Sequence, residues 1–339
     1  MSVICRLGIV LLLVVPVCAN AGRAYVTNED DESVSVLDTD KATVVTTVNV
    51  GKRPRGLKLS PDGKRLYVAV SGLPKCPPTV PDEECAKLKR DLTVDGIAVL
   101  DTGTLKLVKL LKSGSDPEQF DLSHDGKRLF VSNEDSGSLT VVGVESGVVE
   151  ATVPVGKEPE GVRVTPDGRW VVVTSESGNA IYVVDARSLK VVKSVSVGKR
   201  PRDVAFAPDG KTAYVSGEFD ASLYKTTLPE GADAAKLLQL RPEARPMGMV
   251  LDAPRKRLYV STGRGGTVAV VSLEEPKLVA EIPVGARPWG IALSRDGKHL
   301  FTANGPSNDV TVVDTTTLQV VKKIPVGKSP WGVVVDRHD

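Results

Sequence analysis

Apolar and polar residues alternate in short runs along most of the chain, with the period of β-strands that bury one face. RAYVTN at residues 23–28 and SVSVLD at residues 33–38 are two such runs, and Val is frequent in them. Turn-forming Gly, Pro, Asp and Asn separate the runs, and no helical spacing of apolar residues competes with the alternation. The pattern predicts an all-β protein.

The runs belong to a repeat in which a proline precedes the first strand of each unit. The seven prolines are Pro54, Pro117, Pro159, Pro201, Pro246, Pro288 and Pro330. They are separated by 63, 42, 42, 45, 42 and 42 residues, and each unit has room for four strands. Seven four-stranded units predict a seven-bladed β-propeller, whose blades surround a central channel.

The two ends of the repeat region are expected to complete one blade. The segment GVVVDRHD, aligned with GLKLSPDG, stops at the repeat position where GRAYV begins. We therefore expect a C-terminal inner strand at residues 332–336 to pair with three strands from residues 23–50. Such pairing closes the ring and leaves no open edge in it.

The first step of the repeat exceeds the usual 42 residues by 21, and the excess lies at about residues 71–95. We interpret it as an insertion in the first complete blade. It contains Cys76 and Cys85, and a pair of cysteines in an exported protein predicts a disulfide. A redox centre would more often have the spacing C-x-x-C.

Residues 1–21 have the composition of a secretory signal peptide. Arg6 precedes the apolar run Leu7–Val15, and an Ala-Asn-Ala cleavage site follows. A lipoprotein signal at Cys18 ranks lower, because a valine precedes that cysteine, and the apolar run is short for a membrane span of about 20 residues. We expect cleavage to leave a propeller of residues 22–339, secreted into the periplasm, without a membrane span.

The overall charge excludes little by itself. The formal net charge of +2 falls to +1 when Arg6 leaves with the signal peptide, and 41% hydrophobic residues are ordinary for a globular protein. Binding of single-stranded nucleic acid, which depends steeply on salt, has little support from such a balance. The placement of charges therefore matters more than their sum.

Charged and aromatic residues flank the repeat prolines. In propellers, the loop that enters each inner strand and the loop between the second and third strands lie on one face, around the channel mouth, while the PDG turns lie on the other face. The candidate residues for binding a ligand or partner at this mouth are Arg53, Arg55, Glu118, Glu160, Arg200, Arg202, Arg245, Arg287, Trp289 and Trp331. Trp and Arg often anchor interfaces, so these residues could form a recognition surface. Alternatively, the opposite charges form ion pairs between neighbouring blades, each of which contributes little to stability when it is exposed. Trp170 lies in a strand and is expected in the core.

Catalytic signals are scarce. His124 and His338 fall in turns of the far face, and His299 follows one of those turns directly. The sequence contains neither a G-x-S-x-G nucleophile elbow, a phosphate-binding loop nor a haem attachment motif. We therefore expect no metal and no cofactor, and only Glu118 and Glu160 remain as an acid–base pair.

The motifs YVTN at residues 25–28, FVSN at 130–133 and FTAN at 301–304 resemble the YVTN family of seven-bladed propellers. The longer stretches DPEQFDLSHDGKRLFVSNED, FTANGPSNDVTVVD and VGKSPWGVVV are similar to the periplasmic propellers that accompany pyrroloquinoline quinone (PQQ) dependent alcohol oxidation. This resemblance implies a non-catalytic accessory whose partner is a quinoprotein dehydrogenase or its cytochrome. The insertion with the two cysteines departs from that pattern.

Three functions remain open at this point. We favour a monomeric binding or scaffold propeller that docks a protein or a small polar ligand at the channel mouth. A lactonase is the alternative, because similar seven-bladed propellers include sugar-lactone hydrolases. Single-stranded nucleic-acid binding, which also occurs among similar propellers, is the third.

Overall fold

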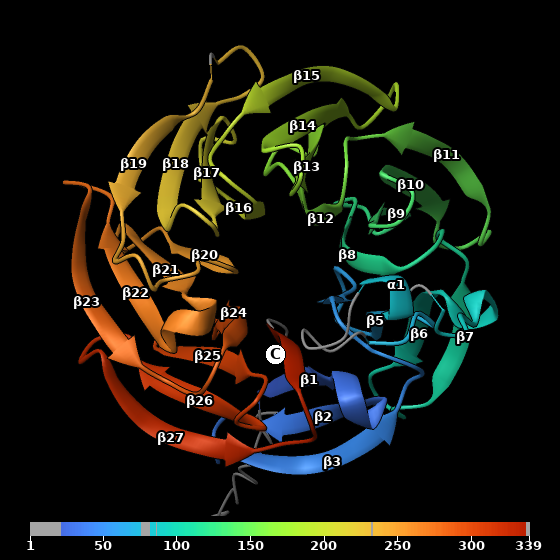
Figure 1. Ribbon diagram of the computed structural model, residues 1–339. Helices are drawn as coiled ribbons and strands as arrows, with labels where there is room; N and C mark the ends of the chain where they lie inside the picture. Colours follow the sequence, from blue (N-terminus) through green and yellow to red (C-terminus); the bar gives the residue numbers. More distant parts are fainter. Residues whose placement is uncertain (1–21, 76–81, 86, 232, 337–339) are drawn as a thin grey trace, which may run out of the picture.

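The computed structural model describes residues 22–75, 82–85, 87–231 and 233–336. Seven antiparallel four-stranded sheets form a ring, which confirms the predicted all-β, seven-bladed propeller (Figure 1). The predicted signal peptide and Cys76 lie outside the described residues, as does the side chain of Cys85, so the predicted disulfide falls outside them too. No helix of the described chain is long and apolar enough to cross a membrane.

Each blade runs from an inner strand at the channel to an outer strand at the rim of the ring. The blade that joins the chain ends contains β28 (Pro330–Val335), β1 (Arg23–Asn28), β2 (Ser33–Asp38) and β3 (Thr43–Asn49). The second contains β4 (Leu57–Leu59), β5 (Arg65–Val70), β6 (Gly96–Asp101) and β7 (Leu107–Leu111). The third contains β8 (Pro117–Leu122), β9 (Arg128–Asn133), β10 (Ser138–Gly143) and β11 (Val149–Pro154). The fourth contains β12 (Pro159–Val164), β13 (Trp170–Ser175), β14 (Ala180–Asp185) and β15 (Lys190–Ser196).

The remaining three blades complete the ring. The fifth contains β16 (Pro201–Phe206), β17 (Thr212–Gly217), β18 (Ser222–Thr227) and β19 (Ala235–Gln239). The sixth contains β20 (Met249–Asp252), β21 (Arg257–Ser261), β22 (Thr267–Ser272) and β23 (Lys277–Pro283). The seventh contains β24 (Pro288–Leu293), β25 (His299–Asn304), β26 (Asp309–Asp314) and β27 (Gln319–Pro325). The short helical elements are η1 (Glu29–Asp31), α1 (Asp82–Cys85), η2 (Leu92–Val94) and η3 (Gly263–Gly265).

The ring closes as predicted, through strands from both ends of the described chain. β28 pairs antiparallel with β1, with Val335 opposite Ala24 and Val333 opposite Val26. Ala24 and Val26 are completely buried and pack against the seventh blade. The closing contact therefore combines backbone pairing with an apolar core, as in the other blades.

Hydroxyl groups of the second strands link neighbouring blades near the channel. Thr27 Oγ1 donates to the Arg55 carbonyl at 2.8 Å, and Ser132 Oγ donates to the Glu160 carbonyl at 2.6 Å. Ser261 Oγ makes the equivalent bond to the Trp289 carbonyl, also at 2.6 Å. Because each acceptor belongs to the residue after a repeat proline, these bonds fix the backbone of the channel mouth.

Glycines next to these carbonyls allow the blades to approach one another. A Cβ at Gly161 would lie 2.4 Å from the Arg202 carbonyl oxygen, and a Cβ at Gly290 would lie 2.7 Å from the Trp331 oxygen. Both distances are too short for a side chain. Glycine at the third position of these inner strands, two residues after the proline, is thus a steric condition for a tight channel.

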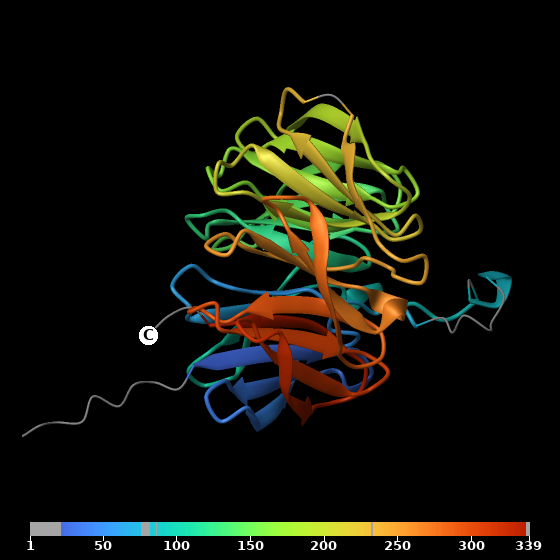
Figure 2. The ribbon, with the colours of Figure 1, turned by 90° about the vertical axis from the view of Figure 1, so that its left-hand side faces the viewer.

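The two faces of the disc differ in what they carry. Figure 2 shows the segment with α1 protruding from one face, which is also the face of the repeat prolines, because the insertion contacts them there: the Arg53 guanidinium donates to the Leu73 carbonyl at 2.7 Å. His124 lines a cleft between the turns of the opposite face. Trp170 is buried in the core, as expected from its strand position.

Candidate functional site

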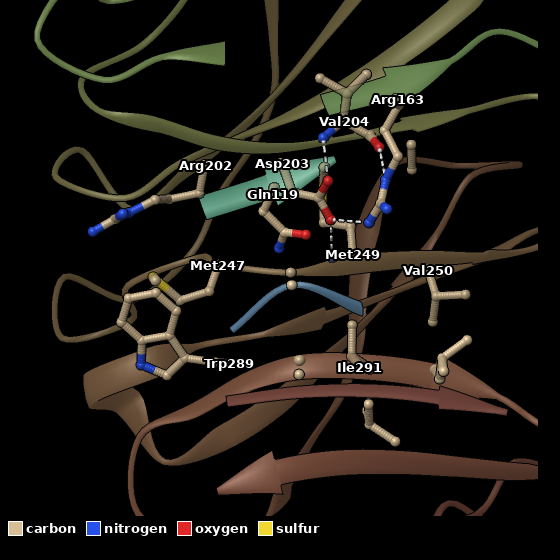
Figure 3. A pocket seen from close by; sticks show the side chains of 18 of the residues that line it. Gln119, Arg163, Arg202, Asp203, Val204, Met247, Met249, Val250, Trp289 and Ile291 are labelled. Carbon is tan, nitrogen blue, oxygen red and sulfur yellow. Dashed lines mark hydrogen bonds and ion pairs between the residues drawn. The ribbon is translucent and has the colours of Figure 1, made fainter. Parts of the chain in front are cut away.

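The inner strands line a cavity of about 320 Å³. Figure 3 shows Arg202, Met247 and Trp289 at one end of this cavity, with Arg163 and Val250 further along it. Its walls are chemically unequal. The second to fifth blades contribute charged and amide side chains, whereas the fifth to seventh and the closing blade contribute Met, Trp, Ile and Val.

The residue after each repeat proline forms the uppermost layer of this channel. In ring order this layer consists of Trp331, Arg55, Glu118, Glu160, Arg202, Met247 and Trp289. All except Trp289, which is half-buried, are buried. The residues that follow the prolines thus lie at the mouth, and the ion pairs expected between neighbouring blades are present there. These pairs are buried rather than exposed, because Arg55 is only 2% and Arg202 only 8% exposed.

The residues before the prolines adopt a left-handed backbone in six of the seven units. Arg53 has a φ of 42°, and Arg200 has a φ of 56°. This conformation is unfavourable for residues other than glycine, and it turns the chain sharply where it enters each inner strand. Arg53, Arg200, Arg245 and Arg287 lie outside the buried layer and are more exposed than the residues that follow the prolines, although the backbone of Arg245 is not left-handed.

Arg55 is the centre of a first buried ion-pair cluster. Its guanidinium donates to the carboxylates of Asp116 and Glu118 and, at 2.9 Å, to the Pro117 carbonyl. Asp116 also accepts a hydrogen bond from Ser71 at 2.6 Å. The Glu118 carboxyl is in turn hydrogen-bonded to Glu134. The carboxyl oxygens of Asp116, Glu118 and Glu134 all lie within 4.8 Å of one another, a spacing that could suit a metal ion. The Arg55 guanidinium already pairs with the first two, so a metal ion could use all three only if Arg55 moved away.

Arg202 is the centre of a second cluster. Its guanidinium donates to Glu160 and Glu176, and its Nε donates to Glu218 at 2.7 Å. Arg200 lies beside the same acids, with its Nε 2.7 Å from Glu176 and 3.2 Å from Glu218. Two guanidinium groups therefore face three carboxyls.

The surplus of carboxyls changes their protonation. Burial, together with the neighbouring Glu134 and Asp116, raises the pKa of Glu118 to about 8 against the opposing effect of Arg55. Burial likewise raises the pKa of Glu176 to about 9, against the opposing effect of Arg200. Each cluster therefore holds one carboxyl that is largely protonated at neutral pH, as expected where buried carboxyls lie close together.

Tryptophan rings cover the other side of the mouth. The centroids of Trp289 and Trp331 lie 5.1 Å apart, with ring planes tilted by 39°. The Arg202 and Arg287 guanidinium carbons lie 5.3 Å and 5.1 Å from the Trp289 centroid. The two tryptophans thus lie side by side, and two arginines, Arg202 and Arg287, lie over Trp289.

A second charged layer lies below the mouth and was missed in the sequence. Arg163 donates to Asp203 at 2.9 Å, and Lys58 lies 3.4 Å from Asp121. Burial and the nearby Arg163 lower the pKa of Lys58. Lys58, Asp121 and Arg163 occupy the fourth position after their repeat prolines, and Asp203 occupies the second. The repeat therefore reveals that these positions are equivalent, but not that their side chains point into the channel.

The glutamates that complete the clusters were also missed as site residues. Glu29, Glu134, Glu176 and Glu218 each directly follow a second strand. The repeat contains this signal, because the same position recurs in four blades. Only the closed ring shows that these glutamates turn toward the arginines of the inner strands.

Two family models match parts of the chain. Residues 16–157 match the Lactonase, 7-bladed beta-propeller family, and residues 238–339 match the YNCE-like beta-propeller family. Among curated proteins, Antigen Lp49 of Leptospira interrogans serogroup Icterohaemorrhagiae serovar copenhageni is 31% identical over 111 residues. That match covers 33% of this chain and only 23% of the antigen.

Solved structures share the fold over most of their length. Hydrazine synthase of Kuenenia stuttgartiensis has a TM-score of 0.72 and 23% identity, covering 86% of this chain and 92% of that one. A putative 6-phosphogluconolactonase of Bacteroides fragilis NCTC 9343 has a TM-score of 0.75 and 19% identity, covering 95% and 99%. Another from Bacteroides uniformis ATCC 8492 has a TM-score of 0.74 and 18% identity, covering 93% and 100%.

At these identities the structural matches establish the fold and not an activity. The predicted association with PQQ-dependent oxidation gains no support from them and stays a prediction. The two family models and the ring of seven four-stranded sheets agree with one another. The chain is a seven-bladed β-propeller, and its N-terminal and C-terminal parts are similar to the lactonase and YNCE-like propeller families.

Proposed function

We propose that the channel mouth binds a small polar ring compound of the lactone class and hydrolyses its ester bond. The observation that carries this proposal is the mixed lining of the cavity, in which Arg202 lies beside Trp289 and Met247 at one end (Figure 3) and Glu160 lines the same cavity. An aromatic ring can cover the flat face of a cyclic compound, while charged groups next to it contact its oxygen atoms. The volume of about 320 Å³ suits a ligand of this size.

The groups at the mouth can perform each step of ester hydrolysis. Glu160 lines the cavity as a candidate base that takes a proton from water, and the water oxygen then attacks the carbonyl carbon of the ligand. The Arg202 guanidinium stabilises the oxyanion that forms. The ring carbon–oxygen bond breaks next, and the proton passes to the ring oxygen, so that a hydroxy acid leaves.

The comparisons favour this reaction class. The lactonase family model covers residues 16–157, which include Arg55 and its partners Asp116 and Glu118. Two of the similar structures are described as putative 6-phosphogluconolactonases. This support reaches the cluster of Arg55 but stops short of Glu160 and Arg202.

A panel of neutral γ- and δ-lactones tests the proposal, with acid release followed in a pH-stat above the spontaneous rate. Glu160→Gln should lower kcat/KM by roughly 100-fold or more, since it removes the base but keeps the shape. Glu145→Gln is the matched control, because Glu145 is exposed and lies away from the mouth. If the wild-type protein hydrolyses no lactone of the panel, the proposal is rejected.

A second candidate is binding without turnover. It is favoured by the engagement of Glu160 with Arg202, since a carboxylate that is held by a guanidinium is less accessible to a water molecule. In this case the protein would be a periplasmic accessory of a quinoprotein alcohol oxidation system and would dock a dehydrogenase or its cytochrome at the mouth. Capture of such a partner from periplasmic extract by the wild-type protein, but not by Trp289→Ala, would support it, and identical captured sets would refute it.

A further inference from the structure

Three arginines on the sixth and seventh blades lack the carboxylate partners that Arg55 and Arg202 possess. Within the described part of the chain, no acidic side chain forms an ion pair with Arg245, Arg264 or Arg287. Arg264 and Arg287 are exposed, and Arg245 is half-buried. The mouth therefore has a sector of uncompensated positive charge beside its tryptophans.

The backbone holds these arginines close together. The Arg245 amide donates to the Thr262 carbonyl at 2.8 Å, and η3, which carries Arg264, follows Thr262 directly. η3 packs against β24, the strand that begins immediately after Arg287. Gly263 opens this turn with a φ of 49°, and a Cβ there would lie 2.8 Å from the Arg245 oxygen. The turn therefore depends on glycine, and it brings Arg264 to the mouth.

Aromatic rings position two of the guanidinium groups. The Arg245 guanidinium carbon lies 5.2 Å from the centroid of Phe219, whose side chain is 53% exposed, and Arg200 lies on the same ring at 4.9 Å. Arg287 lies over Trp289 at 5.1 Å. Burial and the adjacent charge of Arg264 lower the pKa of Arg287, as expected where positive charges crowd together. A cleft or surface lined by charges of one sign attracts counter-ions, so these guanidinium groups favour the binding of an anion.

We propose that Arg245, Arg264 and Arg287 form an anion-binding subsite, which takes a multivalent oxyanion beside Trp289. Guanidinium groups bind phosphate and carboxylate oxygens with two parallel hydrogen bonds, so both a phosphate ester and a polycarboxylate fit this chemistry. If the oxyanion is a substituent of the lactone ring, the subsite rests on the proposed function. If the oxyanion binds as a ligand in its own right, the subsite is independent of that function. The subsite then selects ligands whose charged group projects out of the cavity toward the sixth and seventh blades.

Tryptophan fluorescence provides a direct test. The sequence contains three tryptophans, so Trp170→Phe leaves only the Trp289–Trp331 pair as reporters. Titration with pyrophosphate, glucose 6-phosphate and citrate at low salt should give saturable changes that weaken as NaCl is added, while glucose should give none. A response to the two phosphates alone assigns a phosphate site, and a response to citrate alone assigns a carboxylate site.

The double substitution Arg264→Gln and Arg287→Gln should weaken anion binding at least tenfold. Arg187→Gln is the matched control, since Arg187 is an exposed arginine of the opposite face. Circular dichroism melts verify that each variant is folded. Equal affinity in the double variant and the control, or no saturable response to any of the three anions, overturns the subsite.

The two proposals fail separately. Glu160→Gln should keep anion binding while it loses lactone hydrolysis. If the wild-type protein binds the anions but hydrolyses no neutral lactone, the subsite stands and the proposed function falls. If neutral lactones are hydrolysed but no anion binds, the proposed function stands and the subsite falls.

Discussion

Arg202 and Glu160 occupy equivalent positions on adjacent inner strands and form a buried ion pair across the boundary between two blades. The same guanidinium also binds Glu176 and Glu218. One side chain therefore compensates acids from two blades. This arrangement makes the charges of the mouth part of the folded core as well as of a candidate site.

Removal of Arg202 should be strongly destabilising. Arg202→Met keeps much of the side-chain volume but leaves three buried carboxyls without their shared cation, and breaking a buried pair in this way costs about 3–5 kcal/mol. Urea unfolding at pH 7 measures the free energy of unfolding. Arg187→Met, on the exposed opposite face, should change it by less than about 0.5 kcal/mol. A loss below about 1 kcal/mol for Arg202→Met would contradict the buried network.

Stability should fall as the pH rises through the neutral range. The pKa values of Glu118 and Glu176, about 8 and about 9 in the folded protein, lie above those of the unfolded chain, which are near 4.5. Between these limits the folded state binds more protons than the unfolded state, so raising the pH favours unfolding. Each group contributes at most about 1.4 kcal/mol per pH unit.

Denaturant unfolding at pH 5.5, 6.5 and 7.5 measures this slope. Glu118→Gln replaces a protonated carboxyl by an amide of the same shape. It should remove the contribution of Glu118 to the pH dependence of the unfolding free energy, and so make that dependence less steep. Its effect should also be smaller at pH 5.5 than that of Arg202→Met. A stability that rises steadily over this range would show that the surplus carboxyls are not protonated.

The glycines of the inner strands offer a test of the channel geometry. Gly161→Ala places a Cβ 2.4 Å from the Arg202 carbonyl oxygen, so the fourth and fifth blades must separate. We expect a loss of about 1–3 kcal/mol, the usual cost of overpacking. Gly103→Ala is the control, because its Cβ would meet only Asp101 Oδ1 at 3.4 Å. Equal stability of the two variants would mean that the blades are less tightly apposed than described.

Much of the fold was readable from the chain because a propeller repeats one local pattern. The spacing of Pro54 and its equivalents predicts the number of blades, and the alignment of the chain ends predicts the pairing of β28 with β1. Both inferences use positions within a single repeat. They do not require knowledge of how distant blades contact one another.

The chemistry of the mouth depends on those distant contacts and was only partly predictable. The positions that flank the repeat prolines identified Arg55, Glu118, Glu160 and Arg202 as candidates, since equivalent positions of a propeller meet at one channel mouth. Their burial was not readable, because it arises from the glutamates that enter from the second strands. Arg264 was not chosen as a site residue for another reason: its turn, η3, belongs to one blade, and by itself the GRGG loop is a weak signal for an anion site.

The tryptophan pair should control ligand affinity more than the rate of reaction. Trp289→Leu removes the half-buried ring that lies beside Arg202 in the cavity wall, and with it a stacking surface worth about 0.5–1.5 kcal/mol beyond its buried area. The KM for a lactone substrate should rise about tenfold, while kcat changes less than threefold, since the ring contacts ground state and transition state alike. Trp170→Phe, in the core of another blade, should alter neither constant. A tenfold fall of kcat without a change in KM would instead show that Trp289 stabilises the transition state more than the bound substrate. The proposed role of the aromatic wall in ground-state binding would then be wrong.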